Sequence, residues 1–423
     1  MSFKPTLEHA QKLDSKDELS HFRKRFHIPK HEGQEAVYLC GNSLGLQPKS
    51  AKNAIGRELK DWAKFGVEGH FRGKNPWLYY HKFLKEASAE IIGAKPVETV
   101  IMNSLTVNLH LMMVSFYQPT KKRFKIIMEA DAFPSDHYAM ASQAEFHGFE
   151  AEKAVIQLYP RKGEVALRTE DILAKIEEEG DELALVMLGG VNYYTGQFFE
   201  LEKITKKAHS VGAFCGFDLA HAVGNVKLEL HKWKVDFAVW CTYKYLNSGP
   251  GGSSGVFVHE THSKNKKLPR FAGWWGHNEE ERFLMDKKFK PMVGADGWQL
   301  SNAQILPMAV HKASLEIFEE AGMENLLAKS KKLTGYLEFL VGELNNEQDK
   351  LKIKIITPES RGCQLSLVFS KHGKKVYNKI SKKGVIADWR EPDVIRIAPV
   401  PLYNSFEDVF RFYELLKETI GKL

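Results

Sequence analysis

The fold that we expect rests on AFCGFDLAHAVGN, residues 213–225, and VDFAVWCTYKYLNSGPGG, residues 235–252. Their apolar runs, 213–217 and 235–240, have the length and the β-branched and aromatic content of buried strands. The polar residues that follow these runs are Asp218, His221, Thr242, Tyr243 and Lys244. Ligands of parallel α/β sheets bind beyond the carboxyl ends of the strands, so we expect these side chains to meet in one site.

Lys244 is the residue of this group that most needs an explanation. A partly buried ammonium loses solvation, which makes it easier to deprotonate to a nucleophilic amine. A lysine next to an aspartate from the neighbouring strand and a glycine-rich loop suits a pyridoxal phosphate (PLP) site. Lys244 would hold the aldehyde as a Schiff base, and Asp218 would pair with the pyridinium nitrogen. At roughly 3–4 Å and an effective dielectric of about 20, that attraction is on the order of 4 kcal/mol before desolvation. The spacing alone leaves open a surface lysine and a capping aspartate.

Several motifs in the chain resemble those of kynureninases, which are PLP-dependent hydrolases of tryptophan catabolism. The motifs are DLAHAVGN (218–225), TYKYLNSGPGG (242–252), GWWGH (273–277), IRIAPVPLYNSF (395–406), GNSLGLQP (41–48), SLTVNLH (104–110), FPSDHYA (133–139) and YTGQ (194–197). The resemblance runs from about Tyr38 to the C-terminus. It implies an α/β protein of PLP fold type I, with a large parallel-sheet-based domain and a small α/β domain. It also implies hydrolytic Cβ–Cγ cleavage of L-kynurenine or 3-hydroxy-L-kynurenine to anthranilate or 3-hydroxyanthranilate and L-alanine, serving tryptophan degradation and NAD biosynthesis.

The expected domains are an N-terminal segment, 1–65, that packs with the small domain, a large PLP-binding domain, 66–315, and a small C-terminal domain, 316–423. The large domain alternates strands and amphipathic helices, which argues for a parallel sheet covered on both faces. The expected strands are 99–102, 125–128, 183–188, 213–217, 235–240 and 255–259, and the expected helices are 51–65, 107–116, 136–147, 170–178 and 200–211. In the C-terminal part we expect strands at 353–356, 364–369 and 394–397 after long helices between 303 and 344.

By resemblance, one set of residues binds the cofactor: Leu105, Thr106, Phe133, Pro134, Ser135, Asp136, Asp218, His221, Tyr243, Lys244, Trp274 and Asn302. Asn103 to Thr106 follow a strand and open a helix, where N–H groups and a hydroxyl suit the phosphate; an ordinary Ser or Thr N-cap is the alternative. Phe133 would stack on the pyridine ring or simply belong to the core, and Asp136 could equally be an N-cap. Trp274 and Asn302 would come from the partner subunit of a homodimer with shared active sites.

The resemblance gives the substrate four contacts: Ser43, His70, Asn302 and Arg396. A solvated loop histidine is the alternative for His70, and a structural salt bridge is the alternative for Arg396, although the family arginine grips the α-carboxylate with two prongs. His70 and Asn302 face the aromatic ring in members that favour 3-hydroxykynurenine. The catalytic residues would be Lys244, which removes the Cα proton, Tyr243, a proton donor, and Asp218.

Gly189 departs from some members of the family, which have a serine at this position. The hydroxyl that they place near the cofactor ring is therefore missing here. Whether a backbone group, a water or Thr195 replaces it is left open by the sequence.

Composition narrows the class of protein further. The 423 residues are 43% hydrophobic and 27% charged, which excludes a disordered or fibrous chain. No apolar run approaches the roughly 20 residues of a membrane span, and the N-terminus has no apolar targeting segment, so we expect a cytoplasmic protein without a membrane partner. The net charge of +7 is spread over 60 basic and 53 acidic residues, and short basic clusters such as 121–123 and 264–267 look like solvated loops without the features of a nucleic-acid site. The cysteines, Cys40, Cys215, Cys241 and Cys363, form no C-x-x-C pair, so we expect free thiols and no metal.

Two other functions compete with this interpretation. A cysteine desulfurase or class V aminotransferase shares the Asp and Lys arrangement, but a desulfurase needs a reactive cysteine on a mobile loop. A non-catalytic binding protein on the same scaffold should have lost Lys244, Asp218 or Arg396, and all three are present.

Overall fold

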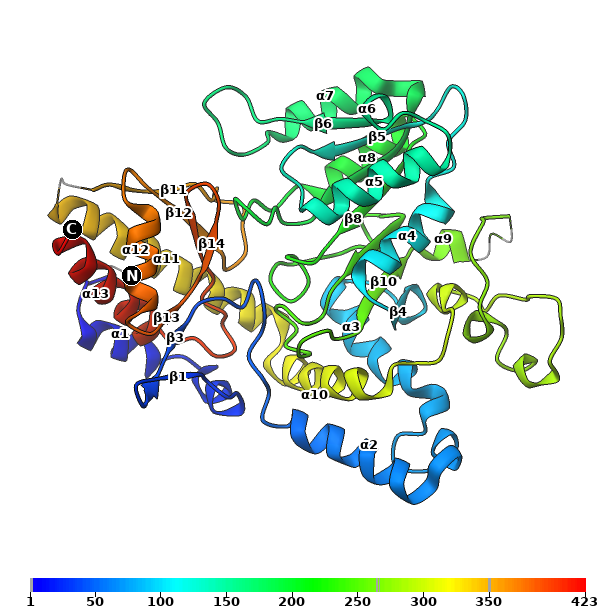
Figure 1. Ribbon diagram of the computed structural model, residues 1–423, viewed down its shortest axis with the longest axis horizontal. Helices are drawn as coiled ribbons and strands as arrows, with labels where there is room; N and C mark the ends of the chain where they lie inside the picture. Colours follow the sequence, from blue (N-terminus) through cyan, green and yellow to red (C-terminus); the bar gives the residue numbers. More distant parts are fainter. Residues whose placement is uncertain (1–2, 264, 266, 349–350) are drawn as a thin grey trace.

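A seven-stranded sheet forms the centre of the larger of two α/β domains in the computed structural model (Figure 1). The structure describes residues 3–263, 265, 267–348 and 351–423, so Lys264 and Lys266 of the basic cluster 264–267 lie outside the described residues. The strand order is β4-β10-β9-β8-β7-β5-β6. The strands are β4 (Thr99–Met102), β5 (Lys125–Glu129), β6 (Val155–Leu158), β7 (Leu183–Gly189), β8 (Phe214–Asp218), β9 (Phe237–Trp240) and β10 (Ser254–Val258).

The sheet is mostly parallel, as predicted, but one of its strands is antiparallel. β10 runs antiparallel to both of its neighbours, β9 and β4, whereas β6, β5, β7, β8 and β9 are mutually parallel. The connection 241–253 turns back at the carboxyl end of β9 without a helix, and antiparallel neighbours need no longer crossover. The edge strand β6 was not predicted, because VIQL is only four residues long and mostly half-buried or exposed.

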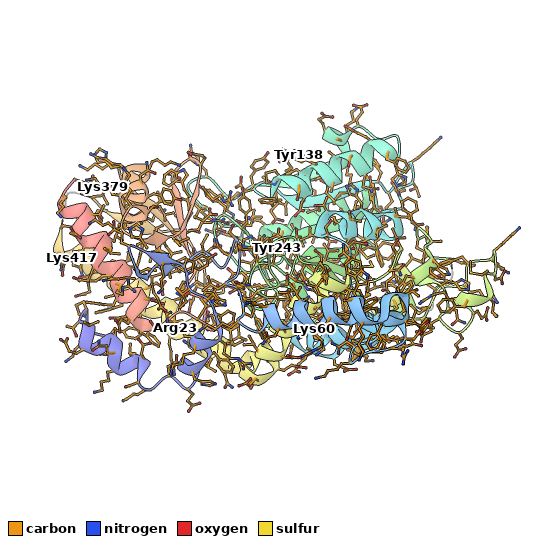
Figure 2. The ribbon with its side chains drawn as sticks, turned by 60° about the horizontal axis from the view of Figure 1, so that its bottom comes forward. Arg23, Lys60, Tyr138, Tyr243, Lys379 and Lys417 are labelled. Atoms are coloured by element: carbon orange, nitrogen blue, oxygen red, sulfur yellow. The ribbon has the colours of Figure 1, made fainter. Side chains whose placement is uncertain are left out.

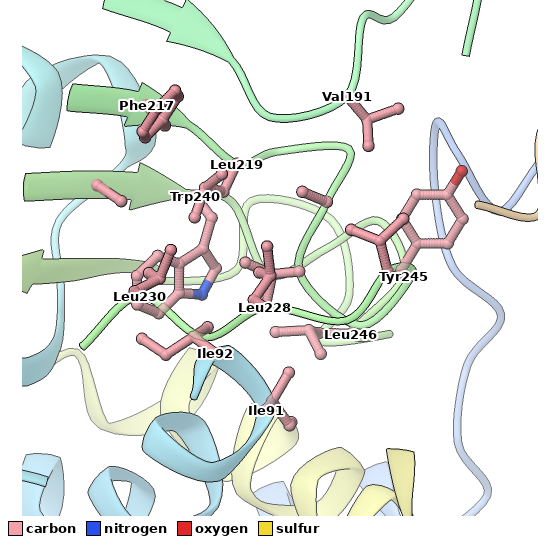
Figure 3. Packing of buried hydrophobic residues seen from close by; sticks show 14 of the residues in the cluster. Ile91, Ile92, Val191, Phe217, Leu219, Leu228, Leu230, Trp240, Tyr245 and Leu246 are labelled. Atoms are coloured by element: carbon pink, nitrogen blue, oxygen red, sulfur yellow. The ribbon is translucent and has the colours of Figure 1, made fainter. Parts of the chain in front are cut away.

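The two faces of the sheet bury alternate residues of the same strands. In β7, Val186 and Leu188 enter a core that includes residues of α3, α7, α8 and α10, and Leu185 and Met187 enter another with α4 and α5. Both faces are therefore covered, which explains why the strands read as continuous apolar runs. Figure 3 shows the first core, where Phe217 and Trp240 extend from the sheet and Ile91 and Ile92 from a helix.

The helices of the large domain confirm the predicted alternation. They are α2 (Ala51–Phe65), α3 (Lys85–Ile92), α4 (Leu105–Phe116), α5 (Pro134–Phe146), α6 (Ala151–Ala154), α7 (Thr169–Glu179), α8 (Leu201–Ser210), α9 (Glu260–Ser263) and α10 (Ile305–Ala321). Among the described residues, no helix combines the length and the apolar character needed to cross a membrane.

The small domain has an antiparallel sheet of order β11-β12-β15-β14. Its elements are β11 (Ile353–Ile355), β12 (Leu365–Phe369), β14 (Asp388–Arg390), β15 (Val394–Ile397), α11 (Met323–Glu347), α12 (Gly373–Ser381) and α13 (Phe406–Gly421). Leu365, Leu367, Ile395 and Ile397 form its core with apolar residues of α11 and α13. The strands predicted at 353–356, 364–369 and 394–397 are thus present.

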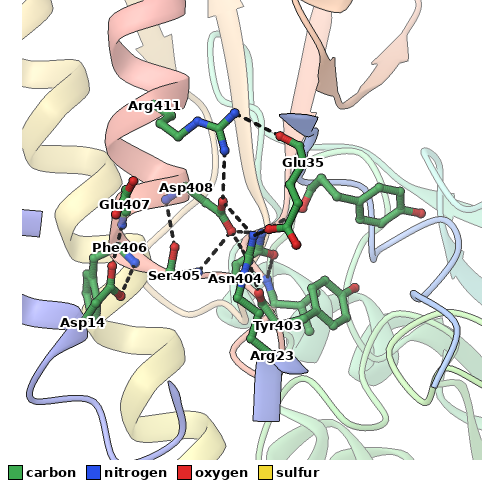
Figure 4. Close-up of polar contacts among 12 residues, drawn as sticks. Asp14, Arg23, Glu35, Tyr403, Asn404, Ser405, Phe406, Glu407, Asp408 and Arg411 are labelled. Atoms are coloured by element: carbon green, nitrogen blue, oxygen red, sulfur yellow. Dashed lines mark hydrogen bonds and ion pairs between the residues drawn. The ribbon is translucent and has the colours of Figure 1, made fainter. Parts of the chain in front are cut away.

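The N-terminal segment packs on this small domain. Its elements are α1 (Leu7–Asp14), a 3-10 helix (Ser20–Arg25), β1 (Lys30–His31), β2 (Gln34–Glu35) and β3 (Val37–Tyr38), which pairs in parallel with β13 (Val385–Ile386). Asp14 accepts the N–H groups of Phe406 and Glu407 at the start of α13, and Arg23 binds Asp408 at 2.6 Å (Figure 4). A carboxylate is favourable at a helix N-terminus, so these contacts fasten the segment to α13.

The domain limits at residues 65 and 315 stay a prediction, and the packing favours other positions. α2 packs against α10 of the large domain rather than with the N-terminal segment. The two long helices α10 and α11 meet at Gly322, whose φ of 72° suits glycine and ends α10. We therefore propose boundaries near residue 50 and at Gly322. Tyr243 is drawn near the middle of the molecule in Figure 2, whereas Lys379 and Lys417 lie at the outer edge of the small domain.

Candidate active site

A cavity of about 360 Å³ lies where the carboxyl ends of the large-domain strands face the small domain. The predicted site residues that line it are Ser43, Leu105, Thr106, Phe133, Ser135, Asp136, Asp218, His221, Tyr243, Lys244 and Arg396. They follow β4, β5, β8 and β9, and the N-terminal segment and β15 complete the wall. The structure thus brings most of the predicted residues together, in a volume typical of a small-molecule site.

Asp218 and Asp136 form a hydrogen-bonded carboxyl pair in this cavity. Burial raises the pKa of Asp136 well above its usual range, and the charge of Asp218 adds to the shift. Burial also raises the pKa of Asp218, but Lys244 and the Ala220 N–H oppose this, the latter donating to Oδ1 at 2.7 Å. Asp136 therefore keeps the proton and donates a hydrogen bond to an anionic Asp218. Asp136 is the third residue of α5 and not its N-cap, which is Phe133, so the N-cap alternative was wrong.

Lys244 and His221 lie side by side, with Lys244 Nζ 3.0 Å from His221 Nε2. Burial, and then the charge of Lys244, lower the pKa of His221 well below its usual range. The imidazole is therefore neutral, with Nε2 accepting from the ammonium and the proton on Nδ1. That Nδ1 is buried and has no hydrogen-bond partner within the described part of the chain. Lys244 Nζ also lies 5.9 Å from the centroid of the Phe133 ring.

The start of α4 offers free backbone donors to the same cavity. Ser104 occupies the N-cap position with extended backbone, φ −111° and ψ 165°, but its side chain makes no capping hydrogen bond. The alternative of an ordinary side-chain cap is therefore wrong for this serine. Leu105 and Thr106, the first two helical residues, line the cavity. Unsatisfied N–H groups at a helix N-terminus attract anions.

Arg396 is buried and is held by the protein itself. Its Nε and Nη2 bind the two Asp388 oxygens at 3.2 and 2.8 Å, and Nη1 donates to the Tyr193 carbonyl at 2.8 Å. The structural salt bridge left open by the sequence is thus present, although Arg396 also lines the cavity. Sequence reasoning missed Arg390, which lines the cavity and binds the same aspartate with Nε at 3.0 Å. Its signal was the two-residue spacing from Asp388, which places both side chains on one face of a strand.

Sequence reasoning also missed Glu129, the last residue of β5. Its carboxyl lines the cavity, and both oxygens accept the Gly189 N–H at 3.1 Å. Thr195 does not fill the space beside Gly189, since its hydroxyl lies 3.1 Å from Asn192 Oδ1 and outside the cavity wall. The side-chain group beside Gly189 is the Glu129 carboxyl, which the sequence alone could not reveal because Glu129 and Gly189 meet only through the β5–β7 pairing.

Tyr243 completes the reactive group of side chains. Burial raises the pKa of its phenol, and the neighbouring Cys241 adds to the shift, so the group stays protonated at neutral pH.

Four predicted residues lie outside this cavity. Pro134 is the first residue of α5. His70 Nδ1 lies 3.0 Å from the Val67 carbonyl, and Asn302 is exposed. Trp274 is 44% exposed and lines a separate groove of about 260 Å³ with His277 and Phe289. Within one chain, the structure does not bring His70, Trp274 and Asn302 to the cavity.

One group of side chains elsewhere has ligand atoms close enough for a metal, namely Glu98, His231 and His259, within 4.8 Å of one another. Both Glu98 oxygens already accept hydrogen bonds, Oε1 from Glu260 N–H and Oε2 from Lys95 N–H. His259 Nδ1 accepts the Thr261 N–H, so its ring proton lies on Nε2, 3.2 Å from the His231 carbonyl. Hydrogen bonds therefore account for this group, which lies at the opposite end of the sheet from the cavity.

Comparisons with known proteins add to this geometry. The family described as kynureninase C-terminal domain matches residues 326–416, and that described as aminotransferase class-V matches residues 37–355. The kynureninases of Flavobacterium psychrophilum and Myxococcus xanthus are 55% and 56% identical to this chain, over 99% and 98% of it and 99% and 97% of their own lengths. The kynureninase of Mus musculus is 50% identical over 97% of this chain and 93% of its own.

Solved structures show the same fold at low identity. A cysteine desulfurase from Thermococcus onnurineus NA1 superposes with a TM-score of 0.74 at 18% identity, covering 92% of this chain and 95% of that chain. A cysteine desulfurase from Escherichia coli has a TM-score of 0.75 at 16% identity, covering 96% and 99%.

Proposed function

Because the chain belongs to the kynureninase family, we propose that this cavity is the active site of a PLP-dependent hydrolase with the substrate's α-carboxylate on Arg396. The reaction is hydrolytic Cβ–Cγ cleavage of L-kynurenine or 3-hydroxy-L-kynurenine, which yields anthranilate or 3-hydroxyanthranilate and L-alanine. The observation that carries the assignment of the site is the convergence of Lys244, Asp218 and Arg396 on one cavity.

The residues of the cavity fit the cofactor. The buried atoms His221 Nδ1 and Asp136 Oδ1 lack partners within the described residues, and the start of α4 presents free N–H groups to an anion. We propose that Lys244 holds PLP covalently, that Asp218 pairs with the ring nitrogen, and that Leu105, Thr106 and Ser135 hold the phosphate. Phe133 would lie against the ring. When bound, PLP withdraws electrons from the substrate and so stabilises negative charge at Cα.

The chain's own residues supply the proton transfers and the binding. Lys244 Nζ, once free, is the base that takes the Cα proton of the substrate. Asp136 keeps its proton and donates a hydrogen bond to Asp218, which keeps that carboxylate charged and in place. The protonated Tyr243 phenol is the donor that returns a proton to the alanine product.

A desulfurase function lacks the thiol that it needs. Burial raises the pKa of Cys363 to about 12 and that of the half-buried Cys40 to about 11. Cys215 and Cys241 are buried, and burial raises their pKa values too. A thiolate nucleophile requires the opposite shift, so the cysteines of this chain are poor candidates.

The assignment of the lysine has a direct test. Borohydride treatment of the purified, PLP-loaded protein, followed by peptide mapping, is expected to label Lys244. In a separate assay of the untreated, PLP-loaded protein, addition of kynurenine is expected to release fluorescent anthranilate and alanine. Labelling of another lysine, or kynurenine left unconverted, contradicts the proposal.

We also propose a homodimer in which Trp274, Asn302 and His70 reach the partner's cavity. Supporting this, apolar side chains gather on the exposed segment 271–293: Phe271 is 58% exposed, Leu284 75% and Met285 72%. Monomers rarely leave such side chains together in water.

A mixture of Lys244→Ala and Trp274→Ala proteins tests the shared site, because only a mixed dimer has one intact site. Recovery of roughly a quarter of the wild-type activity is expected, and no recovery contradicts sharing.

Substrate preference and location follow as further proposals. His70 and Asn302 would hydrogen-bond the ring hydroxyl of 3-hydroxykynurenine, and an unpaired buried polar group costs about 1–3 kcal/mol, or roughly 5- to 150-fold in preference. The measurement is kcat/KM for both substrates in the native protein and in Asn302→Thr; a ratio of the two kcat/KM values that the substitution leaves unchanged contradicts this preference.

We propose a cytoplasmic location, which the free cysteines favour, and a role in NAD biosynthesis. Cell fractionation tests the location, and deletion of the gene in a host that needs tryptophan-derived NAD tests the role.

A further inference from the structure

The cavity contains a third buried carboxyl besides those of Asp218 and Asp136. Glu129 is 3% exposed, and its hydrogen bonds are those from the Gly189 N–H at 3.1 Å. The charged side chains that act most strongly on Glu129 are acids, Asp218 at the end of β8 and Asp131 in the following loop, and its own charge acts on Asp136 in α5. The cations Lys244, Arg390 and Arg396 line the same cavity. On the β6 side the residue opposite Glu129 is Leu158. A carboxylate in such surroundings is costly, so its presence calls for an explanation.

The chain keeps space for this carboxyl by having glycine at 189. A Cβ there would lie 2.8 Å from Glu129 Oε1. Gly189 is not among the glycines with positive φ, so its backbone would accept other residues. The obstacle to a side chain at 189 is therefore the carboxyl of Glu129.

We propose that Glu129 is a positioning residue of the cofactor site, which acts through Asp218 by adding or removing a negative charge beside it. The proposal rests on the proposed function, because Asp218 is the residue that would pair with the cofactor's ring nitrogen. A charged Glu129 makes the protonated form of Asp136 and of the ring nitrogen more favourable, and a neutral Glu129 does not.

This charge changes near neutral pH. Burial raises the pKa of Glu129 to about 7, the Gly189 N–H opposes the shift, and Asp218 and Asp131 add to it. Since the pKa is higher in the folded protein, the associated stability is present below the unfolded value of about 4.5 and is lost as the pH rises towards 7. Removal of the charge should therefore flatten the pH dependence of stability between pH 5.5 and 8.5.

The first experiment uses the PLP-free protein and compares wild type, Glu129→Gln and Asp131→Asn. Glutamine keeps the size and an acceptor for Gly189 N–H, and the exposed Asp131 is a control for loss of a nearby charge. Between pH 5.5 and 8.5, the Tm of Glu129→Gln relative to wild type is expected to rise by roughly 2–3 °C, and that of Asp131→Asn by much less. Parallel curves for wild type and Glu129→Gln overturn the proposal.

The second experiment follows the absorption of bound PLP in the loaded protein over the same pH range. In wild type and in Asp131→Asn, the absorption of bound PLP is expected to show an inflection near neutral pH. In Glu129→Gln this inflection should shift by half a pH unit or more. If Glu129→Gln fails to fold, Gly189→Ala is used instead. This substitution displaces the Glu129 carboxyl without removing its charge and should move the same inflection. The same inflection in loaded wild type and these variants overturns the role of Glu129 alone. A wild type that takes up no PLP overturns the proposed function, and the role of Glu129 with it, while the first experiment still shows whether Glu129 titrates.

Discussion

Replacement of Arg396 by lysine tests the proposed binding of a substrate α-carboxylate to this residue. The guanidinium has five N–H groups, and three of them are engaged by Asp388 and the Tyr193 carbonyl. The two that remain are one on Nη1 and one on Nη2. Two donors on neighbouring nitrogens can bind both oxygens of one carboxylate, so Arg396 is held by the protein while leaving a two-pronged site free.

Lysine has three N–H groups, so it cannot replace all five contacts. If it keeps Asp388 and Tyr193 satisfied, one donor is left for the substrate, which loses one charge-assisted hydrogen bond. Such a bond contributes about 1.5–3 kcal/mol, so we expect kcat/KM of Arg396→Lys to fall roughly 10- to 150-fold. Arg390→Lys is the matched control, because Arg390 shares Asp388 but its side chain is 37% exposed.

The assay is anthranilate fluorescence, measured with the Tm of each variant. Two competitive inhibitors of the same shape, with and without the carboxylate, separate recognition from folding. The affinity of Arg396→Lys should fall for the first inhibitor and stay unchanged for the second. An unchanged kcat/KM together with a lower Tm, or an equal loss of affinity for both inhibitors, would show that Arg396 serves only the salt bridge to Asp388.

Three further substitutions test the cofactor pairing, the N-terminal attachment and the pH response. Asp218→Asn removes an attraction on the order of 4 kcal/mol, so kcat should fall about 100- to 1,000-fold with a changed spectrum of bound PLP; an unaltered spectrum contradicts the pairing. Arg23→Met removes the closer of two arginine partners of the buried Asp408 carboxylate and leaves Arg411 at 4.0 Å, so urea unfolding should show a loss of about 1.5–3 kcal/mol, whereas a loss below about 0.5 would contradict it. The hydrogen bond to Asp236 raises the pKa of His209, so its stabilisation is present below pH 6.5 and lost at higher pH. His209→Gln should therefore destabilise the protein more at pH 5.5 than at pH 8.5, and an equal loss at both contradicts this.

The architecture could be predicted from the sequence because buried strands are recognisable as short, continuous apolar runs. β4 and β7 were predicted within one residue, since strands that are buried along their length are continuous apolar runs. The direction of β10 was not predictable, because an apolar sequence does not indicate which way its strand runs in the sheet. That direction depends on the path of the loop 241–253. The edge strand β6 was missed because half of its pattern faces solvent.

The site was predictable where a residue follows a strand and obscure where two elements meet. Asp218 ends β8 and Lys244 comes four residues after the end of β9, so their convergence could be expected. Glu129 could not be recognised, because it depends on Gly189 from another strand. Arg390 was overlooked although Asp388 lies only two residues before it on β14. Whether Trp274 belongs to the site depends on a second chain, which no pattern within one sequence describes.

The hydrogen bond from Arg396 to the Tyr193 carbonyl joins the small domain to the large one. A substrate whose carboxylate binds Arg396 while its amino group is held on the cofactor side of the cavity, in the large domain, therefore attaches to both domains at once and stabilises their association. Ligand at 100 times its Kd stabilises the bound state by about 2.7 kcal/mol, and here that energy opposes separation of the domains. Saturating substrate analogues should consequently protect β14, β15 and the loop after β7 together against hydrogen exchange, although these segments belong to different domains.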